Sequence, residues 1–238
     1  MEKIPKKYLA IIPAYNEQDA IKQVVKDVQA LPVNIDVVVI DDGSADNTSG
    51  AASAAGACVV RLPVNLGIGG AVQTGFKYAV KHRYDVAVQV DGDGQHIAAE
   101  ILKLLEALTR HGTDVVIGSR FLGSEGFKSS RARQVGINLF RFFNSLAIGQ
   151  KITDNTSGFR AYNRAALEFL SENYPCDYPE PESVILLKRN GFSLAEVPVT
   201  MREREHGASS ISAFNGAYYM IKVFLAIFVD LFKEKTAA

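Results

Sequence analysis

Short apolar runs alternate with amphipathic stretches through the first half of the chain. Five runs rich in β-branched residues have the length of buried strands, and they cover residues 8–12, 37–40, 58–61, 86–90 and 115–117. Between them, apolar residues recur at helical spacing over 21–31 and 101–108. This alternation predicts an α/β fold with a mainly parallel sheet and helices on both faces.

The second half of the chain has a less regular pattern. It predicts a surface loop at 123–133, a turn into a strand at 154–160, a helix at 164–170, a proline-rich loop at 174–182, a strand at 196–201, a polar loop at 202–210 and a long helix at 211–233. We expect residues 1–210 to form one domain and residues 211–238 to form a C-terminal amphipathic helix.

The composition adds three limits to this picture. Lys plus Arg equals Asp plus Glu at 26 each, which gives no electrostatic argument for a nucleic-acid partner, and we expect none. Cys58 and Cys176 lack metal-ligand spacing, so we expect free thiols in the core. Residues 1–7 lack the apolar stretch of a signal peptide, so we expect a cytoplasmic protein.

Polar motifs follow four of the predicted strands. They occupy residues 13–17, 41–44, 91–96 and 119–120. In open parallel sheets, ligands bind beyond the carboxyl ends of the strands. We therefore expect these four motifs to form one site.

The motif at residues 91–96, Asp-Gly-Asp-Gly-Gln-His, carries the strongest chemical signal. Asp91 and Asp93 are one residue apart at the end of a buried strand, and two such carboxylates can share Mg²⁺ or Mn²⁺ with substrate phosphates. The cation would stabilise a departing diphosphate. The alternative is a simple Asp-Gly turn, which the other motifs make the weaker interpretation.

The motif after the second strand suits a nucleoside. Asp42 can accept hydrogen bonds from a nucleobase or a ribose hydroxyl, as acidic residues do at other nucleotide sites. Ser44 or Asp46 is the expected cap of the helix that follows.

The motif after the first strand extends the same site. Pro13 fixes the turn, Tyr15 and Glu17 are placed to border a base and a ribose, and Asn16 is the candidate cap of the next helix.

Small residues cluster from Gly67 to Gly75. A dinucleotide-binding G-x-G-x-x-G starting at Gly67 would need glycine where Val72 stands, so that motif is absent. Close approach of a helix to the sheet is the favoured role of these glycines, and Gly67 is also a candidate for contact with the nucleotide.

In their order along the chain, these motifs resemble glycosyltransferase family 2 with the GT-A nucleotide-sugar-binding fold, of the dolichyl- or polyprenyl-phosphate sugar synthase type. The motifs that carry the resemblance lie at residues 13–17, 41–48, 65–75, 91–96, 118–120, 156–160 (Thr-Ser-Gly-Phe-Arg) and 196–199 (Glu-Val-Pro-Val). The resemblance covers residues 8–210 and implies a catalytic domain that transfers a hexose from a nucleotide sugar with inversion.

The resemblance also implies a role for individual residues. Pro13, Tyr15, Glu17 and Asp42 would contact the nucleoside, while Asp91, Asp93 and Gln95 would surround the metal and the diphosphate, with Asp93 as the principal metal ligand. Arg120 would lie near the sugar or the acceptor phosphate, Asp154 and Ser157 would shape the acceptor side, and Arg204 and His206 would meet a phosphate from a closing loop.

Several charged residues keep a second interpretation. The run 202–206 can also be a solvated stretch whose charges pair with one another. Glu180 and Glu182 either face the donor sugar or cap a helix that begins near Ser183. His82 and His111 are expected at the surface.

The basic residues favour a phosphate as acceptor. A sugar hydroxyl usually needs a carboxylate base, whereas a phosphate monoester with a second pKa of about 6 is largely dianionic at neutral pH. It needs positive charge instead, which Arg120, Arg131, Arg133, Arg204 and His206 can supply.

The last predicted helix bears on the location of the protein. Residues 213–232 are almost wholly apolar except for Asn215, Lys222 and Asp230. Because the central Lys222 opposes insertion, a helix in the membrane interface or packed on a partner fits better than a spanning one. We expect a peripheral protein on the cytoplasmic face of the membrane, with a small membrane protein or a second copy as partner; burial against its own domain is the alternative.

Three functions are therefore compared. The favoured one is transfer of a hexose, from UDP-hexose before other nucleotide sugars, to a polyprenyl phosphate lipid. The others are a soluble glycosyltransferase that acts on a sugar hydroxyl in polysaccharide synthesis and a non-catalytic nucleotide-sugar-binding regulator. The intact pair of Asp91 and Asp93 argues against the regulator, which has less need of a metal.

Overall fold

The computed structural model describes residues 6–122, 150, 152–176 and 179–202. Within these ranges, seven strands form one sheet in the order β3-β2-β1-β4-β6-β5-β7. The strands are β1 (Tyr8–Ala14), β2 (Ile35–Asp41), β3 (Cys58–Arg61), β4 (Val86–Gln89), β5 (Val115–Ser119), β6 (Arg160–Asn163) and β7 (Leu194–Pro198). The five strands predicted in the first half of the chain are all present.

The sheet is mostly parallel, as the alternation of elements predicts, with β6 as the exception. β1 pairs in parallel with β2 and β4, and β5 pairs in parallel with β7. β6 lies antiparallel between β4 and β5, and Arg160 is in register with both Gln89 and Ile117. The amino end of β6 therefore lies at the same edge as the carboxyl ends of its neighbours, which brings the residues before β6 to the predicted site.

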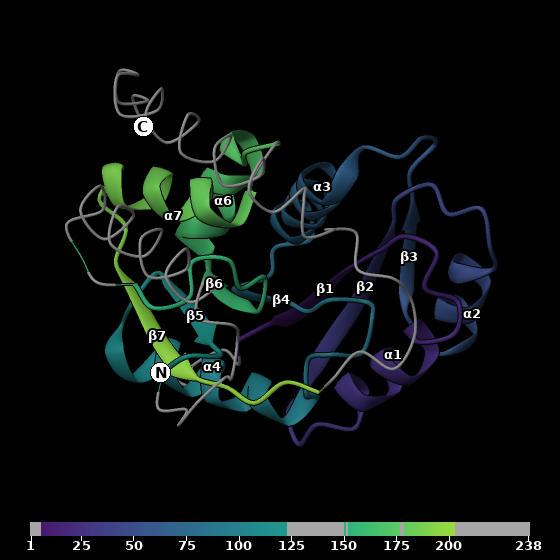
Figure 1. Cartoon of the computed structure of the whole chain (residues 1–238), viewed down its shortest axis with the longest axis horizontal. Helices are drawn as coiled ribbons and strands as arrows, with labels where there is room; N and C mark the ends of the chain where they lie inside the picture. The colour runs from purple at the N-terminus through teal and green to yellow at the C-terminus, as the bar shows by residue number, and fades with distance from the viewer. Residues whose placement is uncertain (1–5, 123–149, 151, 177–178, 203–238) are drawn as a thin grey trace, which may run out of the picture.

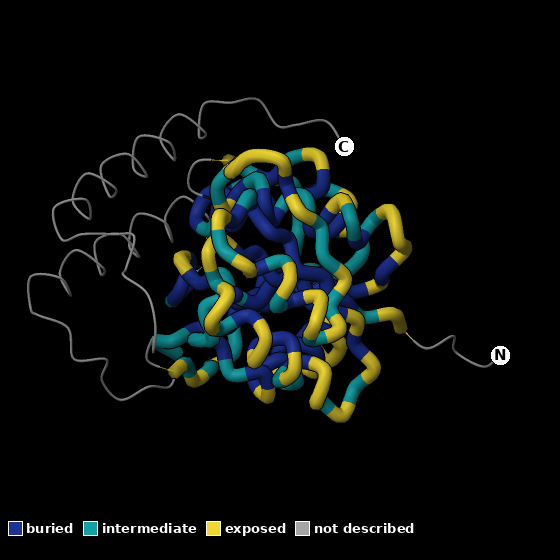
Figure 2. Tube along the Cα trace, turned by 90° about the vertical axis from the view of Figure 1, so that its right-hand side faces the viewer, coloured by how far each residue is buried: buried dark blue, intermediate teal, exposed yellow. Residues whose placement is uncertain are grey.

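Helices cover both faces of the sheet, and Figure 1 shows α3, α6 and α7 on one side with α1 and α4 on the other. The helices are α1 (Ile21–Gln29), α2 (Thr48–Ala54), α3 (Gly67–Lys81), the short 3₁₀ helix η1 (Ala98–Glu100), α4 (Ile101–His111), α6 (Arg164–Asn173) and α7 (Pro179–Arg189). Alternate residues of β1 face opposite layers, so Ile11 belongs to the same core cluster as Phe76 of α3, and Ile12 belongs to the other cluster, with Leu104 of α4. Figure 2 shows these buried segments enclosed by exposed turns.

Three boundaries predicted in the second half of the chain differ from the structure. The predicted loop at 174–182 is wrong in its last part, because α7 begins at Pro179. Pro179 and Pro181 fall in the first turn of α7, where a missing backbone N–H breaks no helical hydrogen bond. The predicted strand at 196–201 is observed as Leu194–Pro198, while the predicted helix at 164–170 is confirmed and extends to Asn173.

The expectation about the cysteines is partly wrong. Both Cys58 and Cys176 are free thiols, but both are exposed instead of lying in the core. Cys58 begins β3, the edge strand of the sheet, where one side has no neighbouring strand to cover it. The predicted surface positions of His82 and His111 are confirmed.

Some predicted elements lie outside the described residues. These are the loop at 123–133, most of the polar loop at 202–210 and the helix at 211–233. In the part of the chain that the structure describes, no helix has the length and apolar character needed to cross a membrane.

Candidate functional site

A cleft of about 890 Å³ lies at the carboxyl ends of β1, β2 and β4. Seven predicted site residues line it together: Pro13, Tyr15, Glu17, Asp42, Gly67, Asp91 and Asp93. Asn65, Thr156, Gly158 and Glu180 also line it. Three of the four polar motifs thus meet in one cleft at the carboxyl ends of the strands, as predicted, while Ser119 and Arg120 of the fourth motif do not line it.

The loops after β1 and β2 are held together by reciprocal hydrogen bonds. The Asn16 N–H donates to Ser44 Oγ, and Asn16 Oδ1 accepts from the Ala45 N–H, both at 2.9 Å. Asn16 has a positive φ of 56°, a conformation that asparagine tolerates better than most residues. The expectation that Asn16 caps α1 is wrong, because Ala20 is the residue at that position.

The N-cap position of α2 is occupied by Asn47, so the expectation that Ser44 or Asp46 caps this helix is wrong. Asp46, one residue earlier, instead supports the first turn through a hydrogen bond. Asp46 Oδ1 accepts from the N–H of Thr48, the first residue of α2, at 2.9 Å. The Thr48 hydroxyl in turn accepts from the Glu17 N–H at 2.9 Å. The two loops that border the proposed nucleoside side of the cleft are therefore one hydrogen-bonded unit.

Asp42 connects this unit to the start of α3. Its Oδ1 accepts from the Leu66 N–H at 2.7 Å, and the Gly67 N–H also contributes a hydrogen bond. Burial raises the pKa of Asp42, although these two backbone donors partly oppose the effect. The carboxylate thus lies at a helix N-terminus, where negative charge is favoured, while it lines the cleft.

The glycines of α3 allow close packing, as predicted. A Cβ on Gly75 would overlap the side chain of Ile11 in β1, and a Cβ on Gly69 would lie 2.7 Å from the carbonyl oxygen of Pro175. Gly67 has a φ of +78° and no neighbour within 4 Å of its Cβ position. Glycine is therefore favoured there by the backbone conformation and not by a lack of space.

The loop that carries the acid pair is held by a buried histidine. The Asp91 N–H donates to His96 Nδ1 at 3.0 Å, and His96 Nε2 lies 3.5 Å from Asp91 Oδ2. The ring of His96 stacks on Phe159 with centroids 4.5 Å apart. Burial lowers the pKa of His96 to about 4, so the ring is neutral at pH 7. Because Nδ1 accepts a hydrogen bond, Nε2 carries the proton, which faces the Asp91 carboxylate.

Asp91 and Asp93 fit a hard divalent cation that is shared with a substrate. Both side chains belong to the wall of the same cleft, and Asp93 Oδ1 accepts from the Gln95 N–H at 3.0 Å. Among the described residues, no three His, Cys, Asp or Glu side chains gather as a metal site. The two carboxylates would therefore leave most of the coordination shell to phosphate oxygens and water, which is how Mg²⁺ is usually bound.

Arg120 and Asp154 form a close ion pair beside the cleft. Asp154 Oδ2 accepts from Arg120 Nε at 2.7 Å and from the Arg120 N–H at 3.0 Å, while Oδ1 accepts from Nη2 at 2.8 Å. Arg120 Nη2 also donates to Thr156 Oγ1 at 2.8 Å, and Thr156 lines the cleft. Arg120 and Asp154 themselves are not among the residues that line the cleft. Ser157 is buried, and its hydroxyl accepts from the Phe159 N–H at 3.2 Å.

The loop before β6 is held from within by Arg160, which is almost fully buried. Its guanidinium donates to the carbonyl oxygens of Ser157, Asn155 and Glu180 and to Ser183 Oγ, at 2.7–3.0 Å. These bonds join the turn before β6 to the first turn of α7. Glu180 lines the cleft, so its contact with a donor sugar stays a prediction. The alternative of a cap on a helix that begins near Ser183 is wrong, because α7 begins at Pro179 and holds Glu180 and Glu182 in its first turn.

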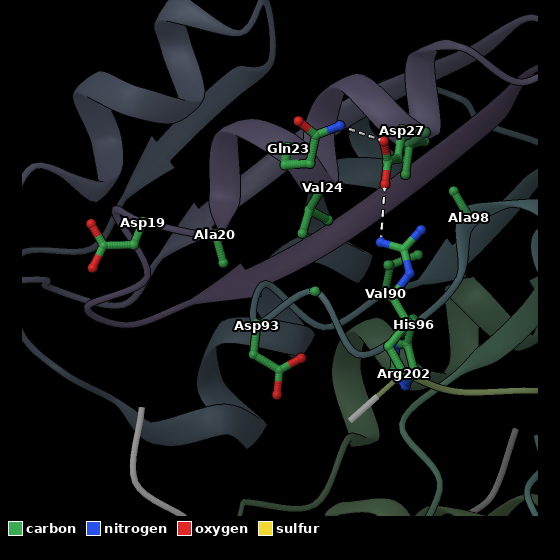
Figure 3. A pocket seen from close by; sticks show the side chains of 12 residues that line it. Asp19, Ala20, Gln23, Val24, Asp27, Val90, Asp93, His96, Ala98 and Arg202 are labelled. Atoms are coloured by element: carbon green, nitrogen blue, oxygen red, sulfur yellow. Dashed lines mark hydrogen bonds and ion pairs between the residues drawn. The ribbon is translucent and has the colours of Figure 1, made fainter. Parts of the chain in front are cut away.

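A smaller cavity of about 120 Å³ lies on the other side of the acid loop, between this loop and α1. Figure 3 shows Arg202 reaching Asp27 of α1, and the two side chains are 3.5 Å apart. The Arg202 N–H also donates to the Gln95 carbonyl at 2.8 Å. The side chain of Arg202 therefore pairs with α1. Its backbone N–H ties the chain after β7 to the loop that carries Asp93. The other residues of the run 202–206, including Arg204 and His206, lie outside the described residues, as do Arg131 and Arg133.

Sequence reasoning gave no role to His96, Thr156, Arg160 or Glu196. Each lies in one of the motifs that carry the family resemblance, and this position was the signal that could have marked it as a functional residue. The partners were not predictable, because they include residues far away in the chain, as for Glu196 with Thr153 and His96 with Phe159. 

The fold is that of known nucleotide-sugar enzymes. The crystal structure of glucosyl-3-phosphoglycerate synthase from Mycobacterium tuberculosis, in complex with Mn²⁺, UDP-glucose and phosphoglyceric acid, matches with a TM-score of 0.71 at 20% identity. The match covers 95% of this chain and 79% of the solved one. The chain therefore has a GT-A-like fold.

Sequence comparison identifies the family. The model of glycosyl transferase family 2 matches residues 9–170. Polyprenol monophosphomannose synthase of Mycolicibacterium smegmatis is 32% identical over 225 residues, which cover 90% of this chain and 84% of that protein. A UDP-N-acetylglucosamine–dolichyl-phosphate N-acetylglucosaminyltransferase of Methanococcus voltae is 32% identical over 209 residues, with 79% and 83% covered. The chain belongs to glycosyltransferase family 2 and is a glycosyltransferase.

Proposed function

We propose that this enzyme transfers a hexose from a nucleoside-diphosphate sugar, with UDP-hexose favoured, to a polyprenyl phosphate lipid. The observation that carries the proposal is the single cleft that holds both the acid pair Asp91 and Asp93 and the predicted nucleoside residues. Two relatives at 32% identity are named for transfer to polyprenol or dolichyl phosphate, which supports the same acceptor class.

The donor would lie along the cleft. Pro13, Tyr15, Glu17 and Asp42 would surround the nucleoside, and the lack of a side chain on Gly67 would let the nucleotide approach the start of α3. Asp91 and Asp93 would hold Mg²⁺ or Mn²⁺, which offsets the negative charge of the diphosphate when bound. Gln95 would keep Asp93 in place through the hydrogen bond from its N–H.

The chemical step would be one displacement at the anomeric carbon. An oxygen of the acceptor phosphate forms the new bond to this carbon as the bond to the diphosphate breaks, and the nucleoside diphosphate leaves. The configuration is inverted. A phosphate monoester is largely dianionic at neutral pH, so no proton has to be removed. Arg120 would reduce the repulsion between acceptor and donor, and Asp154 and Ser157 would shape the acceptor side. Arg131, Arg133, Arg204 and His206 are further candidates for phosphate contacts.

The C-terminal residues 211–238 would bring the enzyme to its lipid substrate. We propose that they form an amphipathic helix that meets the cytoplasmic face of the membrane, a small membrane protein or a second copy of the chain. Their apolar sequence, interrupted by Lys222, supports this arrangement.

A panel assay tests the proposed reaction. The purified protein is incubated with Mn²⁺ and UDP-glucose, UDP-N-acetylglucosamine or GDP-mannose, with and without undecaprenyl phosphate. We expect a lipid-linked sugar, and we expect Asp93→Asn to lower its rate by about 100-fold, as the loss of one charge-stabilising group does in other enzymes. Product formed only with an oligosaccharide acceptor would contradict the lipid acceptor.

The matched control is Asp85→Asn. Asp85 precedes β4 at the opposite edge of the sheet and accepts from the Lys7 N–H at 2.8 Å. The Asp85→Asn variant should retain nearly full activity. If Asp93→Asn is as active as the Asp85 variant at every Mn²⁺ concentration, the metal role of the acid pair is wrong.

A further inference from the structure

Glu196 of β7 holds the turn that carries Asp154. Its Oε2 accepts from the Thr153 N–H at 2.8 Å, and its Oε1 accepts from the Asp154 N–H at 2.9 Å and from Thr153 Oγ1 at 3.0 Å. One carboxylate thus binds two successive backbone N–H groups and a hydroxyl. Charged acceptors form stronger hydrogen bonds than neutral ones, so this turn is fixed by the side chain of a residue more than 40 positions away.

The sheet places Glu196 where it can reach this turn. Glu196 is in register with Ile117 of β5, and Arg120 directly follows the end of β5. The Thr153 hydroxyl also lies 2.7 Å from Ser119 Oγ, which joins the turn to the last residue of β5. β7, the turn and the end of β5 are therefore one connected unit.

Asp154 connects the Thr153–Asp154 turn to the guanidinium of Arg120. The side chain of Asp154 is 0% exposed, and its two oxygens bind Nε and Nη2 of the guanidinium at 2.7 and 2.8 Å. Two parallel hydrogen bonds of this kind fix the plane of a guanidinium as well as its position. The Arg120 side chain is 36% exposed, so it is held by a buried carboxylate but reaches the surface beside Thr156 at the cleft wall.

We propose that Glu196 is a positioning residue for Arg120. Its carboxylate sets the Thr153–Asp154 turn, and Asp154 then sets the orientation of the guanidinium that meets the anionic acceptor. The inference rests on the proposed function for the identity of this anion, a phosphate monoester. Glu196 would not touch either substrate and would act through Asp154 alone.

The test is a kinetic comparison of Glu196→Gln with the wild type, using undecaprenyl phosphate and the nucleotide sugar that the wild type accepts. Glutamine keeps one acceptor oxygen but presents an NH₂ group to an N–H donor, so the turn should shift. Misplacement of a positioning group typically costs 10-fold to 100-fold. We expect kcat/KM for undecaprenyl phosphate to fall by about that factor, while the KM for the nucleotide sugar and the affinity for UDP measured by calorimetry stay within about twofold.

A double-mutant cycle separates positioning from a general structural effect. If Glu196 acts only through Arg120, Glu196→Gln should cause little further loss in the Arg120→Ala background. Losses that multiply in the double variant, or an equal loss of UDP affinity, would overturn the proposal. Glu168→Gln is the matched control, because Glu168 forms an exposed ion pair with Arg164 in α6 and should leave all parameters unchanged.

A milder variant covers the case in which Glu196→Gln does not fold. Thr153→Val removes the hydroxyl bonds to Glu196 and Ser119 but keeps both backbone donors, and it should lower the same kcat/KM by a smaller factor. No change in that variant would also overturn the proposal. Failure of the proposed function is a separate outcome, which is seen when the wild type does not use undecaprenyl phosphate. In that case the double-mutant cycle is measured with the acceptor that the wild type does use.

Discussion

Arg160 shows how one buried side chain can order the turn before β6 and the start of α7. It has the largest volume of the almost fully buried side chains in the described part of the chain. The N–H groups of its guanidinium donate hydrogen bonds to backbone carbonyls and to a serine hydroxyl at 2.7–3.0 Å. A buried charge with several hydrogen-bond partners is costly to remove, because each partner is left buried and unsatisfied.

Replacement of Arg160 by methionine should therefore destabilise the protein strongly. We expect the free energy of unfolding, measured by urea denaturation, to fall by about 2–4 kcal/mol, since several buried acceptors lose their donor while relief from burying a charge offsets part of the cost. Arg110→Met, which removes an exposed pair with Glu106, should change it by less than about 1 kcal/mol. Equal effects of the two substitutions would show that the Arg160 bonds carry no net stability.

At the scale of elements, the reversed direction of β6 decides which residues form the site. Had β6 run parallel to its neighbours, the turn with Asp154 and Ser157 would lie at the opposite edge of the sheet. Its antiparallel pairing with β4 and β5 puts the turn next to the acid pair. The hydrophobic pattern predicts a strand here, but the pattern of a short buried strand is the same for both directions.

The contact of α3 with β1 gives a prediction for a single glycine. Gly75→Ala should lower the free energy of unfolding by about 1–3 kcal/mol, because the new methyl group would overlap the fully buried side chain of Ile11. The gain in helix propensity from alanine is about 1 kcal/mol and only partly compensates. Lys77→Ala, at an exposed position of the same helix, is the control for thermal or urea unfolding. A Gly75 variant that is as stable as this control would mean that α3 can move away from the sheet without cost.

At the scale of the whole molecule, Asp114 fastens the edge of the sheet that lies opposite the cleft. It accepts hydrogen bonds from the Ser193 N–H and Oγ, both at 2.7 Å, and from Asn163 Nδ2 at 2.8 Å. Burial alone would raise the pKa of Asp114, but these hydrogen bonds outweigh it and lower the pKa below its ordinary value of 3.8. The ends of three strands thus depend on one ionised carboxylate.

The pH dependence of stability follows from this shift. A carboxyl group whose pKa is lower in the folded state contributes stability above its unfolded pKa of 3.8, and this contribution is lost as the pH falls through the folded value. We expect Asp114→Asn to reduce the loss of stability between pH 5 and pH 2, measured by urea denaturation at a series of pH values. Part of the loss should remain, because the pKa values of Asp41 and Asp46 are also lowered. Ser193→Ala, which keeps the backbone donor, should have a smaller effect; an unchanged pH slope in Asp114→Asn would contradict the assignment.

The sequence alone predicts the class of fold and the cleft at the ends of the parallel strands. The periods of apolar residues follow from local geometry, so they predict the strands and helices of the first half, and the motifs at strand ends predict that Asp42, Asp91 and Asp93 share a cleft. The folded chain alone reveals the direction of β6, the start of α7 among prolines, and the partners of Arg160, Glu196 and Asp154. These depend on which distant segments the sheet brings side by side, and a hydrogen bond between residues 40 positions apart leaves no period in the sequence.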